Sequence, residues 1–203
     1  KMGKYNFHVD GVSIEAVFNK LGGVEGARRF LRDELVISES IRSWREEDGV
    51  IRFSVVSNGL TGEEWIARLE GKWFRVGDYA KQILLSSDFK PTNGVTTEVA
   101  VLKGTLFKDN NRITRKIRVG GDKRGLSKPN PEVACLIREK FTDEEIKAMG
   151  LCWIVVMHEP IEDSGGDPSL LGVHCDVGGD WLLAYYGSSA SRWNRDLGFA
   201  FVR

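Results

Sequence analysis

The side chains best suited to chemistry lie in the last third of the chain. His158–Glu159 follows an apolar stretch, and His174, Cys175 and Asp176 are contiguous. Imidazole, thiolate and carboxylate groups bind transition metals, and a Cys beside a His can act as a nucleophile. However, the chain has three His and three Cys residues, without a His-x-x-x-His or Cys-x-x-Cys spacing. We therefore expect a strand-end hydrogen-bonding role for His158 and a surface position for His174, with no metal, no cofactor and no catalytic residue.

Two basic segments are candidates for a nucleic-acid-binding surface. Residues 112–128 hold seven basic side chains against one acid, and a predicted helical hairpin carries Arg28, Arg29 and Arg32. The first segment has no interleaved aromatic residue, and two nearby acids offset the arginines of the second. The whole chain is neutral, with 29 basic and 29 acidic residues, so it lacks the excess positive charge that favours binding to phosphates. A nucleic-acid-binding module is therefore the weaker alternative.

The last 41 residues have an unusual composition. They contain no Lys, Glu, Gln or Met, whereas residues 1–162 contain 33 residues of these types. Together with Trp, these are the residue types that no codon ending in a pyrimidine specifies. Codons with randomised first and second bases and a fixed final pyrimidine would produce such a segment. Trp181 and Trp193 would then be fixed positions.

Apolar spacing and capping residues predict the elements that position this tail. Helices are expected at residues 13–21, 24–35, 61–72, 77–89, 130–141 and 142–150, and strands at 49–57, 92–107, 151–161, 170–175, 181–186 and 199–202. In the second helix, Ala27, Phe30 and Leu31 are expected to face inward. Helices come first and strands cluster late, which predicts an α+β protein with a mainly antiparallel sheet.

Local signals mark several helix ends. Thr61 and Thr142 each precede a Glu by three residues, which predicts capping boxes. Pro131 is expected at the first position of its helix. The segment 111–126 is predicted to be helical at first and then interrupted by Gly120–Gly121. Neither a secretion signal nor a membrane span is expected, and the cellular location stays open.

The sequence GGDW, followed by a variable stretch and then RWNRDLGFAFVR, resembles the variable region of proteins diversified by diversity-generating retroelements. Gly178, Gly179 and Trp181 match the Gly-Gly-x-Trp element of that family, and Gly198, Phe199 and Arg203 match its closing Gly-Phe-Arg loosely. The closing GFAFVR replaces a compact GFR, which fits a divergent, archaeal-type subclass. The resemblance implies one unit over 1–203, with a helical part at 1–48, a C-type-lectin-like part at 49–203 and a variable region at about 172–203.

In that family, template adenines are miscopied, mostly at AAC or AAT codons. The resemblance implies that the residues which miscopying of such codons can produce form a ligand-binding surface. These residues are His174, Cys175, Asp176, Tyr185, Tyr186, Gly187, Ser188, Ser189, Ser191, Arg192, Asn194, Arg195, Asp196 and Leu197. The implied scaffold residues are Trp181, Trp193, Phe199 and Phe201. Tyr, Ser, Gly and Asn also dominate antibody paratopes, for reasons of rigid contact area and adaptable hydrogen bonding.

The expected function is therefore non-catalytic binding of an unknown ligand, a protein or a surface molecule, through a hypervariable face. That face should be contiguous and exposed, with Trp181 and Trp193 beneath it. Six residues are expected to be largely buried: Val155, Val173, Leu182, Trp193, Phe199 and Phe201. Two functional alternatives stay open: an enzyme on a similar fold, of the formylglycine-generating type or with a Cys/His site, and the nucleic-acid-binding module. A plain β-meander is the structural alternative.

Overall fold

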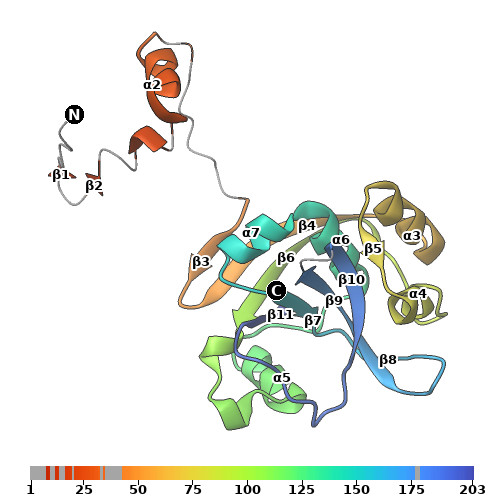
Figure 1. The fold of residues 1–203 in the computed structure, drawn as a ribbon. Coiled ribbons are helices and arrows are strands. Elements are labelled where there is room, and N and C mark those ends of the chain that lie inside the picture. The colour runs from red at the N-terminus through yellow and green to blue at the C-terminus, as the bar shows by residue number, and fades with distance from the viewer. Residues whose placement is uncertain are drawn as a thin grey trace. The chain divides into compact units, whose positions relative to one another are not determined.

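The computed structural model describes residues 8–9, 12–13, 17–19, 21–32, 34, 43–176 and 179–203 (Figure 1). The chain divides into two compact units, Lys1–Arg42 and Ser43–Arg203. Within the described residues, no helix combines the length and the apolar character that a membrane span needs.

The first unit contains a short antiparallel pair, β1 (His8–Val9) with β2 (Val12–Ser13), and the helix α2 (Gly23–Leu31). Ser13 therefore belongs to a strand and does not begin a helix, although residues 17–19 are helical. The rest of that predicted helix lies outside the described residues.

The second predicted helix differs from α2 in length and in its buried face. α2 ends at Leu31 instead of Leu35, and Gly22 precedes it in the left-handed conformation. Ala27 is buried as expected, but Phe30 and Leu31 are 39% and 81% exposed. The expectation that both face inward is wrong, because both lie in the last turn of α2 and are exposed among the described residues.

The second unit is built on one nine-stranded sheet. Its strands are β3 (Arg45–Glu47), β4 (Val50–Asn58), β5 (Arg75–Val76), β6 (Asn93–Lys103), β7 (Trp153–Val156), β8 (Ile161–Glu162), β9 (Pro168–Asp176), β10 (Gly179–Tyr186) and β11 (Leu197–Val202). The strand order is β3-β4-β6-β11-β7-β9-β10-β5, and β8 pairs with β9. The β11–β7 and β10–β5 pairs are parallel, and the other pairs are antiparallel. The α+β class and the mainly antiparallel sheet are thus confirmed.

Helices cover both faces of the sheet (Figure 1). One face, here named the α6 face, packs against α3 (Gly62–Gly71), α4 (Asp78–Leu84), α6 (Glu132–Lys140) and α7 (Asp143–Ala148). The other, the α5 face, packs against α5 (Thr114–Asp122), which follows two short 3₁₀ turns, η1 (Gly104–Leu106) and η2 (Asp109–Asn111). A strand between two such layers must be apolar on both sides, and β11, with the sequence LGFAFV, meets that requirement.

Most local signals act as predicted. Thr61 and Thr142 both form complete capping boxes, with Glu64 and Glu145 as their partners. Pro131 lies one residue before the first residue of α6, a difference within the usual spread of helix boundaries. The predicted strand at 92–107 ends at Lys103, after which the chain forms η1.

The predicted break at Gly120–Gly121 is wrong, because α5 continues through both glycines to Asp122. Packing explains why glycine occupies these positions. A Cβ added at Gly121 would lie 2.7 Å from Cε1 of Phe201, and one at Gly120 would lie 2.7 Å from Cε1 of Phe107. The glycines therefore bring the α5 backbone close to the aromatic rings of the α5 face.

Five of the six expected core residues are buried. Val155, Val173, Leu182 and Phe199 are fully enclosed, and Phe201 is 1% exposed. Trp193 differs, because it is only partly buried.

Candidate ligand-binding surface at the C-terminal tail

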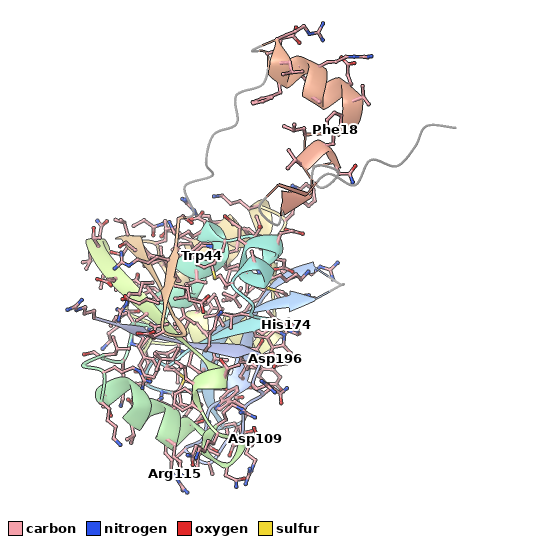
Figure 2. The ribbon with its side chains drawn as sticks, turned by 90° about the vertical axis from the view of Figure 1, so that its left-hand side faces the viewer. Phe18, Trp44, Asp109, Arg115, His174 and Asp196 are labelled. Atoms are coloured by element: carbon pink, nitrogen blue, oxygen red, sulfur yellow. The ribbon has the colours of Figure 1, made fainter. Side chains whose placement is uncertain are left out.

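A row of aromatic side chains crosses the α5 face where β7, β9 and β10 lie side by side. Trp153 of β7 pairs in register with His174 of β9, so their side chains share this face. Their rings are 4.4 Å apart, and the Tyr185 ring of β10 stacks on Trp153 at 5.6 Å. Trp193 follows, with its ring 6.3 Å from that of Tyr185. We name these four residues the aromatic row; each is partly exposed, and Figure 2 marks His174.

The aromatic row is anchored on its inner side. The Trp193 ring meets Phe199, with 6.1 Å between centroids, and its Nε1–H donates to Thr114 Oγ1 at 3.0 Å. The Tyr185 hydroxyl is enclosed without a hydrogen-bond partner among the described residues. Burial raises the pKa of Tyr185, so this residue serves as a neutral aromatic contact.

The segment between β10 and β11, residues 187–196, is here named the tail loop. Its backbone is hydrogen-bonded to the beginning of α5; Figure 2 labels Asp196 of the tail loop and Arg115 of α5. The amides of Thr114 and Arg115 donate to the carbonyls of Ser191 and Ser189 at 3.1 and 3.0 Å, and the Trp193 amide donates to the Arg112 carbonyl at 2.9 Å. The first amides of a helix have no partner inside the helix, so the tail loop supplies acceptors that α5 needs.

Arg112 secures the same junction with its side chain. Its Nε donates to the Trp193 carbonyl at 3.2 Å, its Nη1 to the Phe107 carbonyl at 2.9 Å, and its Nη2 to Asp109 at 2.7 Å. The tail loop and Arg112 border an open depression of about 570 Å³. Its lining residues are Thr105, Arg112, Gly150, Asn194, Arg195 and Asp196.

The predicted variable residues fall into separate groups. His174 and Tyr185 belong to the aromatic row, whereas Cys175 and Tyr186 alternate to the α6 side of the sheet. The exposed members of the tail loop are Ser189, Arg192, Asn194, Arg195 and Asp196, and the partly exposed ones are Ser188 and Ser191. The expectation of one contiguous face is therefore wrong, because neighbouring strand residues point to opposite faces. The side chain of Asp176 lies outside the described set.

The predictions for two ligand-binding residues and for one scaffold residue are also wrong. Leu197 is 1% exposed, and a Cβ at Gly187 would lie 2.5 Å from Cγ of Leu170, so neither can present a variable side chain to a ligand. Trp181 is partly exposed and lies beside the aromatic row, not beneath it, because it pairs in register with His174 of β9 on one side and with Arg75 of β5 on the other. Phe199 and Phe201 are buried as expected of scaffold.

His158 has a structural role. It is fully buried; its Nδ1–H donates to the Glu159 carbonyl at 2.6 Å, and its Nε2 accepts the Leu171 amide at 2.8 Å. Both ring nitrogens are therefore occupied. Burial lowers the pKa of His158 to about 4, so the ring is neutral near pH 7.

The thiols are poor nucleophiles. Burial, and then the neighbouring Asp143, raise the pKa of Cys175 to about 12. Burial together with Asp196 raises the pKa of Cys152, and burial raises that of Cys135. A thiol with a raised pKa forms little thiolate at neutral pH. Among the described residues, no group of three or more His, Cys, Asp or Glu side chains is arranged to hold a metal.

Most of the candidate nucleic-acid contacts take part in intramolecular pairs. Arg32 lies 3.5 Å from Glu25 and 3.3 Å from Glu34, and Arg28 lies 3.4 Å from Glu25. In the 112–128 segment, Arg118 donates to the His158 carbonyl and Lys128 pairs with Glu159. Several of the basic side chains are thus engaged by acceptors within the molecule.

Comparisons with known protein families, with curated proteins and with solved structures find no match. The site is therefore interpreted from its own geometry. Trp153 is a member that sequence reasoning missed, because it lies on a strand distant in sequence and joins the row only through the β7–β9 pairing.

Proposed function

We propose that the protein is a non-catalytic, receptor-like binding protein whose contact surface consists of the aromatic row and the exposed side chains of the tail loop. The observation that carries the proposal is the combination of stacked, partly exposed aromatic rings with a backbone-anchored loop of small polar residues. Rigid aromatic side chains supply contact area at low entropic cost, and Ser and Asn adapt their hydrogen bonds. A protein or another surface molecule is the ligand class that suits such a surface.

We extend the proposal to diversification by a retroelement, with residues 172–203 as the diversified region. The anchoring of the tail loop supports this extension, because the hydrogen bonds from Thr114 and Arg115 go to backbone carbonyls. Such bonds survive when side chains are exchanged. The nine-stranded sheet would then be a divergent form of the C-type-lectin fold.

The genomic test needs no protein. We expect a reverse transcriptase beside the gene, with a near-repeat of the region that encodes residues 172–203. The two copies should differ only where the repeat has adenine. Absence of a repeat, or differences at other bases, would refute the retroelement while leaving the binding surface to be tested separately.

A displayed library tests the surface itself. Randomising Ser189, Arg192, Asn194 and Arg195 together should leave most members folded, because surface substitutions change stability by about 0.5 kcal/mol or less. Selection against immobilised lysozyme as a model protein should recover binders. A matched library at Gly187 and Leu197 should yield mostly unfolded chains, because both positions are enclosed. Equal tolerance in the two libraries, or no binders from the first, would contradict the proposal.

The two rival functions receive less support. The raised pKa values of Cys152 and Cys175 disfavour a thiolate nucleophile. The ion pairs of Arg28 and Arg32 reduce the positive charge that phosphate binding requires. An enzyme on a similar fold would need a reactive group other than these thiols.

A further inference from the structure

Trp73 occupies a position that its own side chain disfavours. It follows α3 with a φ of 67°, in the left-handed region, and it is 92% exposed. The amides of Phe74 and Trp73 donate to the carbonyls of Leu69 and Glu70, both at 3.0 Å. This pair of bonds defines a Schellman motif with Trp73 at the position that usually holds Gly, and sometimes Asn.

Fold stability does not explain a tryptophan at this position. A non-glycine residue in the left-handed region is strained. An indole that is almost fully exposed gains little burial in return. Asp48, the other described non-glycine residue with positive φ, lies in an Asp-Gly hairpin turn where such a residue is favoured. Trp73 has no comparable local reason, which points to a role in binding.

Trp73 borders an open depression of about 520 Å³ at the β5 edge of the sheet. Its lining residues are Glu70, Trp73, Phe74, Arg75, Val76, Gly77, Asp78 and Trp181. Two indoles thus contribute to one surface from segments about a hundred residues apart in the sequence. The volume lies in the range of small-molecule sites, where a few polar groups orient the ligand.

The framework of the depression is well defined. β5 pairs with β10, with Arg75 opposite Trp181, and the Gly77 amide donates to the Leu182 carbonyl at 3.0 Å. The Arg75 guanidinium lies over the Trp181 ring, 5.2 Å from its centroid. A Cβ at Gly179 would lie 3.3 Å from Arg75 Nε, so this glycine leaves room for the guanidinium.

Charge narrows the choice of ligand. Arg75 already occupies one face of Trp181, which disfavours a cationic ligand there. Asp78 and Glu70 disfavour an anion, and Glu70 is itself paired with Lys81 at 2.6 Å. The lining therefore offers one guanidinium donor and two carboxylate acceptors beside the exposed Trp73 and the partly exposed Trp181. This combination suits a neutral ligand with both hydroxyl groups and an apolar face.

We propose that this depression binds a neutral saccharide, with the apolar face of a pyranose ring against the Trp73 indole. Carboxylates of Asp78 and Glu70 accept hydrogen bonds from sugar hydroxyls, and the Arg75 guanidinium donates to them. The depression adjoins the aromatic row, because Trp181 pairs in register with His174. None of its lining residues belongs to the aromatic row or the tail loop, so the two sites can be tested separately.

The test uses the full chain and four probes: cellotetraose, chitotetraose, maltotetraose and mannotetraose. Tryptophan emission and calorimetry measure binding to the wild type, to Trp73→Gly and to the control Tyr79→Ala. Tyr79 is an exposed aromatic residue of α4 that does not line the depression. We expect at least one probe to bind the wild type and the control equally, and to bind Trp73→Gly at least about tenfold more weakly, a loss of 1.4 kcal/mol or more.

Stability separates a binding role from a packing role. Glycine relieves the strain at this position, so we expect Trp73→Gly to raise Tm by about 2–4 °C. A lower Tm would mean that Trp73 packs against the fold, and would overturn the inference. Failure of all four probes, unchanged affinity in Trp73→Gly, or binding of tetramethylammonium or of a proline-rich peptide in their place would also overturn it. A tail-loop library member that still binds the saccharide would show that the two sites are separate.

Discussion

Titration of His158 couples one buried ring to the stability of the whole fold. Burial lowers its folded pKa to about 4, whereas the unfolded value is about 6.5. The unfolded chain therefore takes up this proton first as the pH falls. The contribution of the neutral ring to the free energy of unfolding is fully present above about pH 6.5. This contribution falls by about 3 kcal/mol as the pH falls towards 4.

Urea unfolding between pH 7.5 and pH 4 measures this loss. Carboxylates also titrate in that range, so His158→Gln is the matched control, because its amide can donate to Glu159 and accept from Leu171 without charging. We expect the variant to lose less stability than the wild type over the same interval. An identical pH dependence in the two proteins would show that His158 is not the coupled group.

Residue types alone identified part of the candidate site. The unusual composition of the tail pointed to Tyr185 and to the tail loop, and both are partly or largely exposed. Composition could not reveal Trp153 or Trp73. Trp153 enters the aromatic row through strand pairing, and Trp73 stands out only through its backbone conformation. Neither property is encoded in local composition.

Helix α5 illustrates how packing overrides helix propensity. Gly→Ala in a helix interior normally stabilises by about 1 kcal/mol. At Gly121 we expect the opposite, a loss of about 1–3 kcal/mol, because the new Cβ would lie 2.7 Å from the Phe201 ring. Denaturant unfolding of Gly121→Ala measures the change.

Gly71 provides the matched control, because it ends α3 and no atom lies within 4 Å of a Cβ added there. Gly71→Ala should be neutral or stabilising by up to about 1 kcal/mol. If both variants gained stability, the close packing of α5 on Phe201 would be wrong. This contrast also explains why the sequence predicted a helix break at Gly120–Gly121. Local helix propensity treats glycine as a helix breaker, whereas here glycine is required by the close packing of α5 against aromatic rings from other parts of the chain.

At the scale of the whole molecule, hydrophobic patterns predicted the class but not the topology. Alternation and apolar runs located β4, β6, β7, β9, β10 and β11. The strand order follows from pairings between distant segments, such as β11 with β6 and β7. An apolar pattern with a period of two residues indicates which face of a strand is buried, but it does not indicate which strand lies beside it. The aromatic row depends on that order, so the sequence could indicate its members only in part.

β11 is an interior strand of the nine-stranded sheet. β11 pairs with both β6 and β7, and it carries the buried side chains of Phe199 and Phe201. Deleting residues 197–203 would leave β6 and β7 without their shared partner and expose both core layers. We expect this truncated chain to lose its cooperative thermal transition. If it unfolded cooperatively near the wild-type Tm, the central placement of β11 would be wrong.

Deleting residues 1–42 is the opposite case and the control. Residues 43–203 retain the complete nine-stranded sheet and the core on both of its faces, so we expect a cooperative transition within a few degrees of the full chain. The comparison bears on function as well. If the proposed diversification occurs, the burial of β11 would confine it to the tail loop and to the partly or fully exposed side chains of β9 and β10.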